Sequence, residues 1–112
     1  MPLDKRETER EPGYAKVWVK ELKSPAYLRD MNIGGIKLAI PDNIRVGKDD
    51  KLSLVIIPEE TIGIPSFELE VEIRWTRNEE IYTTIGTSIT SFPKPLYRTS
   101  YEHLLEYYLS QG

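Results

Sequence analysis

The chain has 112 residues, of which 39% are hydrophobic and 29% are charged, with a formal net charge of -3 and no cysteine. This size and composition indicate one globular domain. The lack of cysteine excludes disulfides, thiolate nucleophiles and cysteine-ligated metals, and the acidic balance argues against a general nucleic-acid binder.

No hydrophobic stretch approaches the roughly 18 residues that a membrane-spanning helix needs. The N-terminus is charged and lacks the hydrophobic core of a signal peptide. We therefore expect a cytoplasmic protein without membrane insertion. The start of the sequence and the predicted closing helix favour a stand-alone domain over a part of a longer protein.

Residues 1–13 are polar, carry charges of both signs and end in Pro12-Gly13, so we expect them to form a flexible arm. Residues 14–92 contain six segments with strand patterns, separated by turn residues. These segments are Tyr14–Glu21, Ala26–Met31, a strand starting at Ile36, Leu52–Ile57, Phe67–Trp75 and Ile81–Thr90.

The segment Phe67–Trp75 has the clearest alternation. Hydrophobic residues occupy every second position up to Trp75, and the positions between them hold Glu68, Glu70, Glu72 and Arg74. A sheet with one solvated face produces this pattern. The alternation favours core packing for Trp75 over a role as a base-stacking wall.

In residues 93–112 the hydrophobic period changes to that of a helix. Thr99 and Glu102 have the spacing of a capping box. We expect an amphipathic helix that packs its Leu/Tyr face on the strands or on a partner; this face consists of Tyr97, Tyr101, Leu104, Leu105 and Tyr108. Six strands and one helix predict an all-β fold, an antiparallel barrel or sandwich, with a C-terminal helix.

Two short motifs suggest a ligand site. Arg6 and Arg10 lie on the predicted arm, and Asp30, Asn32 and Gly35 follow about one strand later. An arginine can grip a phosphate or the O6/N7 edge of guanine, whereas a carboxylate can accept hydrogen bonds from the Watson–Crick edge. Each motif alone is typical of solvated charges or of a tight turn; together, in this order, they favour an anionic guanine nucleotide.

With these motifs the chain resembles the PilZ domain, a bacterial receptor module for cyclic di-GMP. The family signature is Arg-x-x-x-Arg, a gap of about one strand, and then Asp/Asn-x-Ser-x-x-Gly. Arg6 and Arg10 match the first part, and Asp30 and Gly35 match the second. The resemblance covers nearly the whole chain and implies a six-stranded antiparallel β-barrel closed by a C-terminal helix.

The resemblance also implies a function without catalysis. Arg6 and Arg10 would grip guanine and phosphate, Asp30 and Asn32 would hold the other edge of the base, and Gly35 would allow close approach. Binding would move the arm and thereby signal to a partner protein in the control of motility, biofilm or exopolysaccharide. The C-terminal helix is the candidate surface for this partner. Lys5 and Trp75 are weaker candidates for ligand contact.

Asn32 departs from the family, which usually has Ser at this position, so we expect weakened binding. One alternative is a degenerate PilZ domain that binds no nucleotide and docks a protein through Tyr97, Tyr101 and Tyr108. Another is an oligonucleotide-binding barrel, which the acidic balance disfavours. We expect no cofactor, no metal site and no catalytic residue, since the single histidine, His103, has no partner for a metal cluster or a triad.

Overall fold

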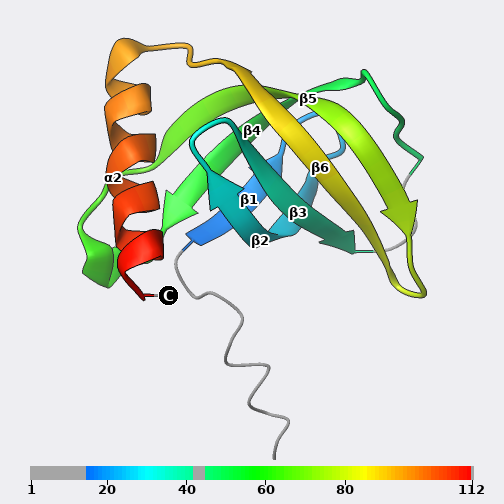
Figure 1. Ribbon diagram of the computed structural model, residues 1–112, viewed down its shortest axis with the longest axis horizontal. Helices are drawn as coiled ribbons and strands as arrows, with labels where there is room; N and C mark the ends of the chain where they lie inside the picture. Colours follow the sequence, from blue (N-terminus) through cyan, green and yellow to red (C-terminus); the bar gives the residue numbers. More distant parts are fainter. Residues whose placement is uncertain (1–14, 42–44, 112) are drawn as a thin grey trace, which may run out of the picture.

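The computed structural model describes residues 15–41 and 45–111 of the chain. It is a closed barrel of six antiparallel strands with one C-terminal α-helix, which confirms the predicted fold (Figure 1). The elements are β1 (Ala15–Val19), β2 (Ser24–Asn32), β3 (Gly35–Pro41), β4 (Lys51–Pro58), the 3₁₀ turn η1 (Glu60–Ile62), β5 (Phe67–Asn78), β6 (Tyr82–Ser91) and α2 (Pro95–Gln111).

Around the barrel the strands follow the order β1-β2-β3-β6-β5-β4. The barrel closes where β1 pairs with β4, with Lys16 opposite Ile57. Strands β2 and β3 form a hairpin in which Asn32 lies opposite Gly35, so the loop between them has two residues. The four neighbouring strands β2, β3, β6 and β5 form one continuous wall.

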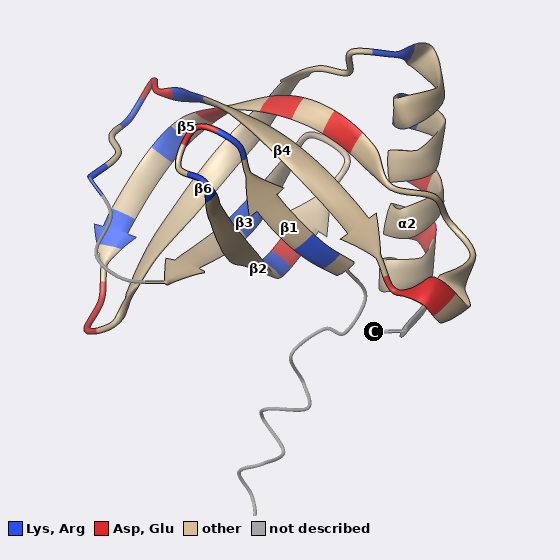
Figure 2. Ribbon diagram, turned by 180° about the vertical axis from the view of Figure 1, so that it is seen from behind, with Lys and Arg blue, Asp and Glu red and all other residues tan. Residues whose placement is uncertain are grey.

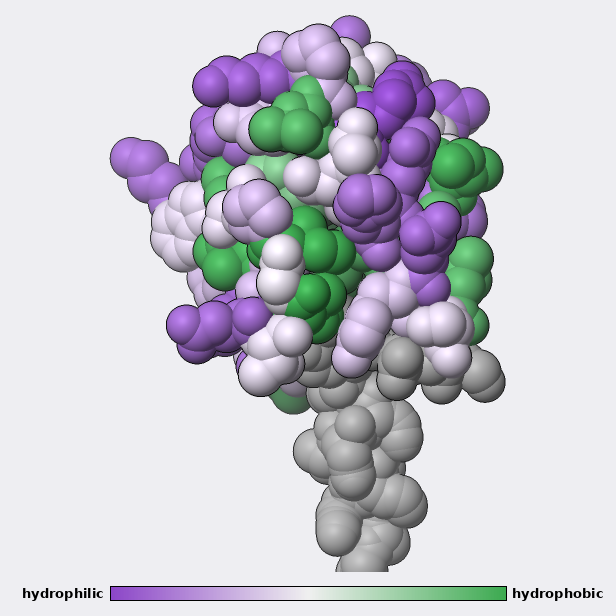
Figure 3. Space-filling view, turned by 90° about the vertical axis from the view of Figure 1, so that its left-hand side faces the viewer, coloured by the Kyte–Doolittle hydropathy of each residue, from purple (hydrophilic) through white to green (hydrophobic). Residues whose placement is uncertain are grey.

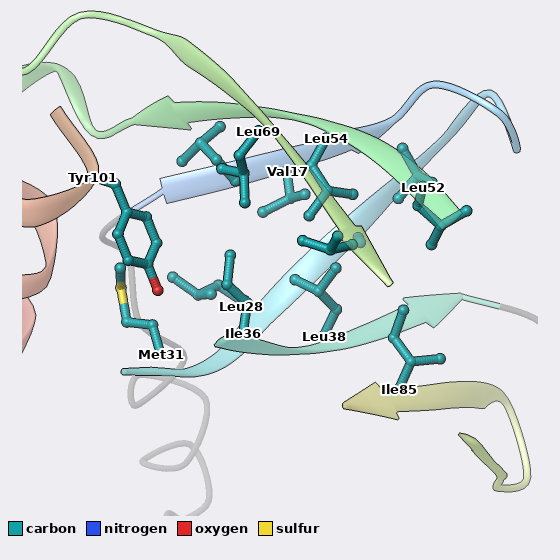
Figure 4. Packing of buried hydrophobic residues seen from close by; sticks show 14 of the residues in the cluster. Val17, Leu28, Met31, Ile36, Leu38, Leu52, Leu54, Leu69, Ile85 and Tyr101 are labelled. Carbon is teal, nitrogen blue, oxygen red and sulfur yellow. The ribbon is translucent and has the colours of Figure 1, made fainter. Parts of the chain in front are cut away.

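The barrel interior is filled by one hydrophobic cluster to which every strand contributes (Figure 4). On β5 the buried residues alternate with the glutamates, as the sequence predicts, up to Ile73. Figure 2 shows the glutamates as red bands along β5, which give way to the blue bands of arginine farther along the strand. The charge on the outer face of β5 therefore changes sign along its length.

Helix α2 stands beside the barrel and packs against β5 and β2 (Figure 1). It begins at Pro95, and proline is well suited to the first helical position because its missing N–H has no partner there anyway. The predicted capping box is therefore wrong, since Thr99 and Glu102 both lie inside the helix. The Leu/Tyr face points inward: Tyr101 and Leu104 are fully buried.

Candidate functional site

A hollow of about 210 Å³ lies on the outer face of the wall formed by β2, β3, β6 and β5. The structure brings four of the predicted ligand residues together there: Asp30, Asn32, Gly35 and Trp75. The other lining residues are Ile36, Lys37, Arg74, Gly86 and Thr87. Lys5, Arg6 and Arg10, which are also predicted ligand residues, lie outside the described residues.

One cross-strand row runs through the hollow. Asp30 of β2 lies opposite Lys37 of β3, Lys37 lies opposite Gly86 of β6, and Gly86 lies opposite Trp75 of β5. Residues directly opposite each other in antiparallel strands have neighbouring side chains. The row therefore presents a carboxylate, an ammonium group, a gap without a side chain and an indole, in that order.

Asp30 reaches the outer face because β2 contains a bulge. The register shifts between Leu28 and Asp30, which leaves Arg29 as the extra residue. Leu28 and Met31 are both buried, whereas Arg29 and Asp30 are both exposed. Without the bulge, the two-residue period of a strand would turn Asp30 toward the core.

A second bulge exposes Trp75. Here the register shifts between Ile73 and Trp75, with Arg74 as the extra residue. Ile73 is fully buried, but Trp75 is 41% exposed. The prediction that Trp75 packs in the core is therefore wrong, because the alternation that supported it is interrupted one residue earlier.

The indole of Trp75 lies directly on Gly86. A Cβ atom at residue 86 would come within 2.3 Å of the indole Cε2 and Nε1 atoms. The guanidinium of Arg77 lies 5.7 Å from the centre of the Trp75 ring, within the range of a cation–π contact. The ring is thus held against the strand beside it while part of its surface remains exposed.

Gly35 has a structural role in addition to lining the hollow. A Cβ atom at this position would come within 2.1 Å of the backbone oxygen of Thr87 on β6. Strands β3 and β6 can therefore pair here only because residue 35 has no side chain. The strand pairing alone explains why residue 35 is glycine. Close approach of a ligand, which was the predicted reason, is not needed.

The side chain of Asn32 is partly committed to the hairpin. Its Oδ1 atom accepts a hydrogen bond of 2.9 Å from the backbone N–H of Gly34, a local contact that asparagine commonly makes in turns. The amide nitrogen forms no hydrogen bond among the described residues. Asn32 can therefore offer a ligand two N–H donors.

Two tyrosines of α2 contact the hairpin that carries these residues. The Tyr108 hydroxyl donates to Asp30 Oδ1 over 2.7 Å. The Tyr101 hydroxyl lies 2.6 Å from the backbone oxygen of Asn32 and 3.2 Å from that of Gly35. Burial, and to a smaller extent the charge of Asp30, raises the pKa of Tyr101 above its ordinary value. This hydroxyl therefore stays protonated and able to donate.

Lys37 and Arg74 add two positive charges to a hollow that contains one negative charge, that of Asp30. In the described part of the chain neither cation forms an ion pair. Neither residue was predicted as a ligand residue from the sequence. Lys37 could have been predicted from the hairpin. A two-residue loop pairs Asn32 with Gly35, and this register determines which residues lie opposite each other farther along β2 and β3.

A second, larger groove of about 1,040 Å³ lies near the start of β1. Most of its lining residues are apolar, and its charged lining residues are Lys16, Glu59 and Glu60. One positive and two negative charges make it unfavourable for an anionic ligand. The smaller hollow is therefore the better candidate for a phosphate-bearing molecule.

Among residues 15–41 and 45–111 there is no cluster of three or more histidines or carboxylates that could hold a metal ion. Within the same residues no helix has the length and hydrophobicity needed to cross a bilayer. His103 is exposed on α2. Comparison of the chain with protein-family models, with curated proteins and with solved structures found no match.

Proposed function

We propose that this chain is a cytoplasmic receptor for cyclic di-GMP and that one guanine of the ligand lies in the hollow beside Asp30. The observation that carries the proposal is the row Asp30, Lys37, Gly86 and Trp75, which combines an edge-binding carboxylate with a cation and an aromatic surface. The resemblance of the two motifs to the PilZ signature supports the same ligand.

The exposed ring of Trp75 supports stacking of a base. Base–aromatic stacking contributes about 1–3 kcal/mol per base by alanine substitution. Because Gly86 leaves room for the indole to lie against β6, the ring needs little reorganisation when a base arrives. A preorganised ring loses less conformational entropy on binding than a mobile one.

The polar groups around the hollow fit guanine better than adenine. The Watson–Crick edge of guanine carries two donors, N1–H and the 2-amino group, which a carboxylate such as Asp30 can accept. The amide nitrogen of Asn32 supplies donors for the acceptor atoms O6 and N7. Asn32 thus replaces the family's serine with a group that can donate but whose oxygen is already used by Gly34.

The charges support a ligand with phosphates. Lys37 and Arg74 lie beside the hollow, and an arginine can bind a phosphate through two parallel hydrogen bonds. The hollow is smaller than the roughly 300–1,000 Å³ of typical ligand pockets, so it suits one base rather than a whole cyclic dinucleotide. In this proposal Arg6 and Arg10, with Lys5 beside them, cover the remainder, and movement of residues 1–13 signals to a partner protein.

The test is calorimetric titration with cyclic di-GMP, with GTP as the control nucleotide. We expect saturable binding at micromolar affinity, lost in the Arg6→Ala/Arg10→Ala variant. Trp75→Ala should weaken binding about tenfold or more. Its matched control is Trp18→Ala, because Trp18 on β1 is 40% exposed and lies outside the hollow. A flat trace from folded protein would refute the proposal.

The alternative function is a PilZ-like module that docks a protein and binds no nucleotide. Its predicted docking face needs correction, because Tyr101 is buried and Tyr97 and Tyr108 are half-buried against the barrel. The exposed hydrophobic residues of α2 are Leu96, Tyr107 and Leu109. Figure 3, which views the α2 side, shows hydrophobic side chains in separate groups between hydrophilic ones. The commitment of Asn32 Oδ1 to Gly34 is the observation that favours this alternative.

A further inference from the structure

The carboxylate of Asp30 is held by a residue 78 positions away in the sequence. Tyr108, near the end of α2, donates its hydroxyl proton to Asp30 Oδ1 over 2.7 Å. The backbone N–H of Met31 donates to the same oxygen over 2.9 Å. Asp30 is otherwise an exposed side chain on the outer face of β2, and such a side chain would sample several rotamers without these two contacts.

The two contacts leave the carboxylate with one oxygen for a ligand. A carboxylate oxygen offers about two lone-pair positions, and those of Oδ1 are taken by Met31 and Tyr108. Oδ2 accepts no hydrogen bond among the described residues. A ligand that approaches through the hollow therefore meets one oxygen whose position is fixed by the other.

The position of Tyr108 is itself fixed by the packing of α2. Tyr101 and Leu104 lie seven and four residues earlier, which places them on the same helix face as Tyr108. Both are fully buried, and the Tyr101 ring contacts those of Phe67 and Phe92. Figure 4 shows Tyr101 extending from α2 toward Met31, the residue after Asp30. The helix therefore acts as a rigid support for the Tyr108 hydroxyl.

From this geometry we infer that Tyr108 is the positioning residue for Asp30 and determines how strictly the site recognises the Watson–Crick edge of guanine. The inference rests on the function proposed above. With Oδ1 held, Oδ2 can accept both N1–H and the 2-amino group of guanine. Without Tyr108 only the Met31 N–H holds Oδ1, so the carboxylate samples more rotamers and faces both donors for a smaller fraction of the time.

The experiment compares two ligands, cyclic di-GMP and its hypoxanthine analogue cyclic di-IMP, which retains N1–H but lacks the 2-amino group. Their dissociation constants are measured for the parent chain, Tyr108→Phe and the control Tyr97→Phe. Tyr97 lies on the same helix and its hydroxyl forms no hydrogen bond among the described residues. Thermal melting by circular dichroism establishes that each variant is folded at the titration temperature.

We expect the parent and Tyr97→Phe to prefer cyclic di-GMP on the order of tenfold, the value of one hydrogen bond to a charged acceptor. In Tyr108→Phe the preference should fall to about threefold or less. Equal weakening of both ligands would overturn the inference, because general loosening of the helix has that effect. If Tyr108→Phe does not fold, Asp30→Ala takes its place, and a retained guanine preference there would also overturn it.

Failure of the inference is distinct from failure of the proposed function. If the folded parent chain binds neither cyclic dinucleotide, the proposed function is wrong and the inference falls with it. If the parent chain binds cyclic di-GMP and the guanine preference of Tyr108→Phe is unchanged, only the role of Tyr108 is wrong.

Discussion

The indole of Trp75 occupies the space that a side chain at residue 86 would need. A Cβ atom there would lie 2.3 Å from two ring atoms and 2.7 Å from a third. Residues 75 and 86 are cross-strand neighbours on β5 and β6, so the absence of one side chain determines the position of the other. This relationship creates an exposed aromatic surface on a barrel wall.

Gly86→Ala should therefore displace the Trp75 ring. We expect the substitution to lower the free energy of unfolding by about 1–3 kcal/mol, as overpacking usually does, and to weaken cyclic di-GMP binding as much as Trp75→Ala does. Urea unfolding and calorimetry measure the two effects. Gly47→Ala is the control, since a Cβ at residue 47 would meet no atom within 4 Å. Unchanged binding by Gly86→Ala would show that the ring position does not matter to the ligand.

The two adjacent glycines of the β2–β3 hairpin should respond differently to substitution. Gly35→Ala places a Cβ atom within 2.1 Å of the Thr87 backbone oxygen, whereas in Gly34→Ala the nearest neighbour, Asn32 Oδ1, is 3.9 Å away. We expect Gly35→Ala to destabilise the fold by about 3 kcal/mol, because a backbone atom cannot swing aside. Gly34→Ala should change stability by less than about 0.5 kcal/mol. Urea midpoints of the two variants test this, and equal midpoints would contradict it.

Trp75 should report ligand binding by fluorescence. The chain has two tryptophans, and Trp18→Phe leaves Trp75 as the single emitter. Because a stacked base covers the exposed part of the indole, we expect cyclic di-GMP to quench emission in Trp18→Phe with the dissociation constant found by calorimetry. Trp75→Phe, in which only Trp18 emits, should show little change. Quenching of Trp18 alone would move the binding site away from the hollow.

The buried hydroxyl of Tyr101 predicts a loss of stability in alkali. Its pKa is raised in the folded chain, mainly by burial, while in the unfolded chain it is about 10. The folded state therefore binds more protons than the unfolded state above that pH, and stability falls as the pH rises further. Below about pH 10 the contribution of the protonated hydroxyl is complete.

Tyr101→Phe should remove this pH dependence. At pH 8 the variant should lose about 1–2 kcal/mol of stability, because the carbonyl oxygens of Asn32 and Gly35 lose their donor. Between pH 8 and pH 10.5 its urea midpoint should fall less than that of the parent chain. Tyr27→Phe, at a tyrosine that is 46% exposed, is the control and should follow the parent. A parallel fall in Tyr101→Phe and the parent would contradict the assignment.

Hydrophobic periodicity by itself predicted the strands and the helix of this protein, and it left a barrel and a sandwich both open. The alternation of buried and solvated positions identifies the strands, since a strand repeats every two residues, and the change of period marks α2. Asp30, Asn32 and Gly35 could be selected only together with Arg6 and Arg10, because Asp, Asn and Gly alone are also the residues that a tight turn prefers. What the sequence left open was which residues of other strands lie beside them.

Tertiary structure decided the composition of the site. Two bulges, at Arg29 and Arg74, turn Asp30 and Trp75 from the core face to the outer face, and a bulge depends on the register of both paired strands rather than on local sequence. Gly86 and Trp75 join the row only because β3 pairs with β6 across the barrel. The contact between Tyr108 and Asp30 spans 78 residues, so it exists only when the helix is docked on the closed barrel.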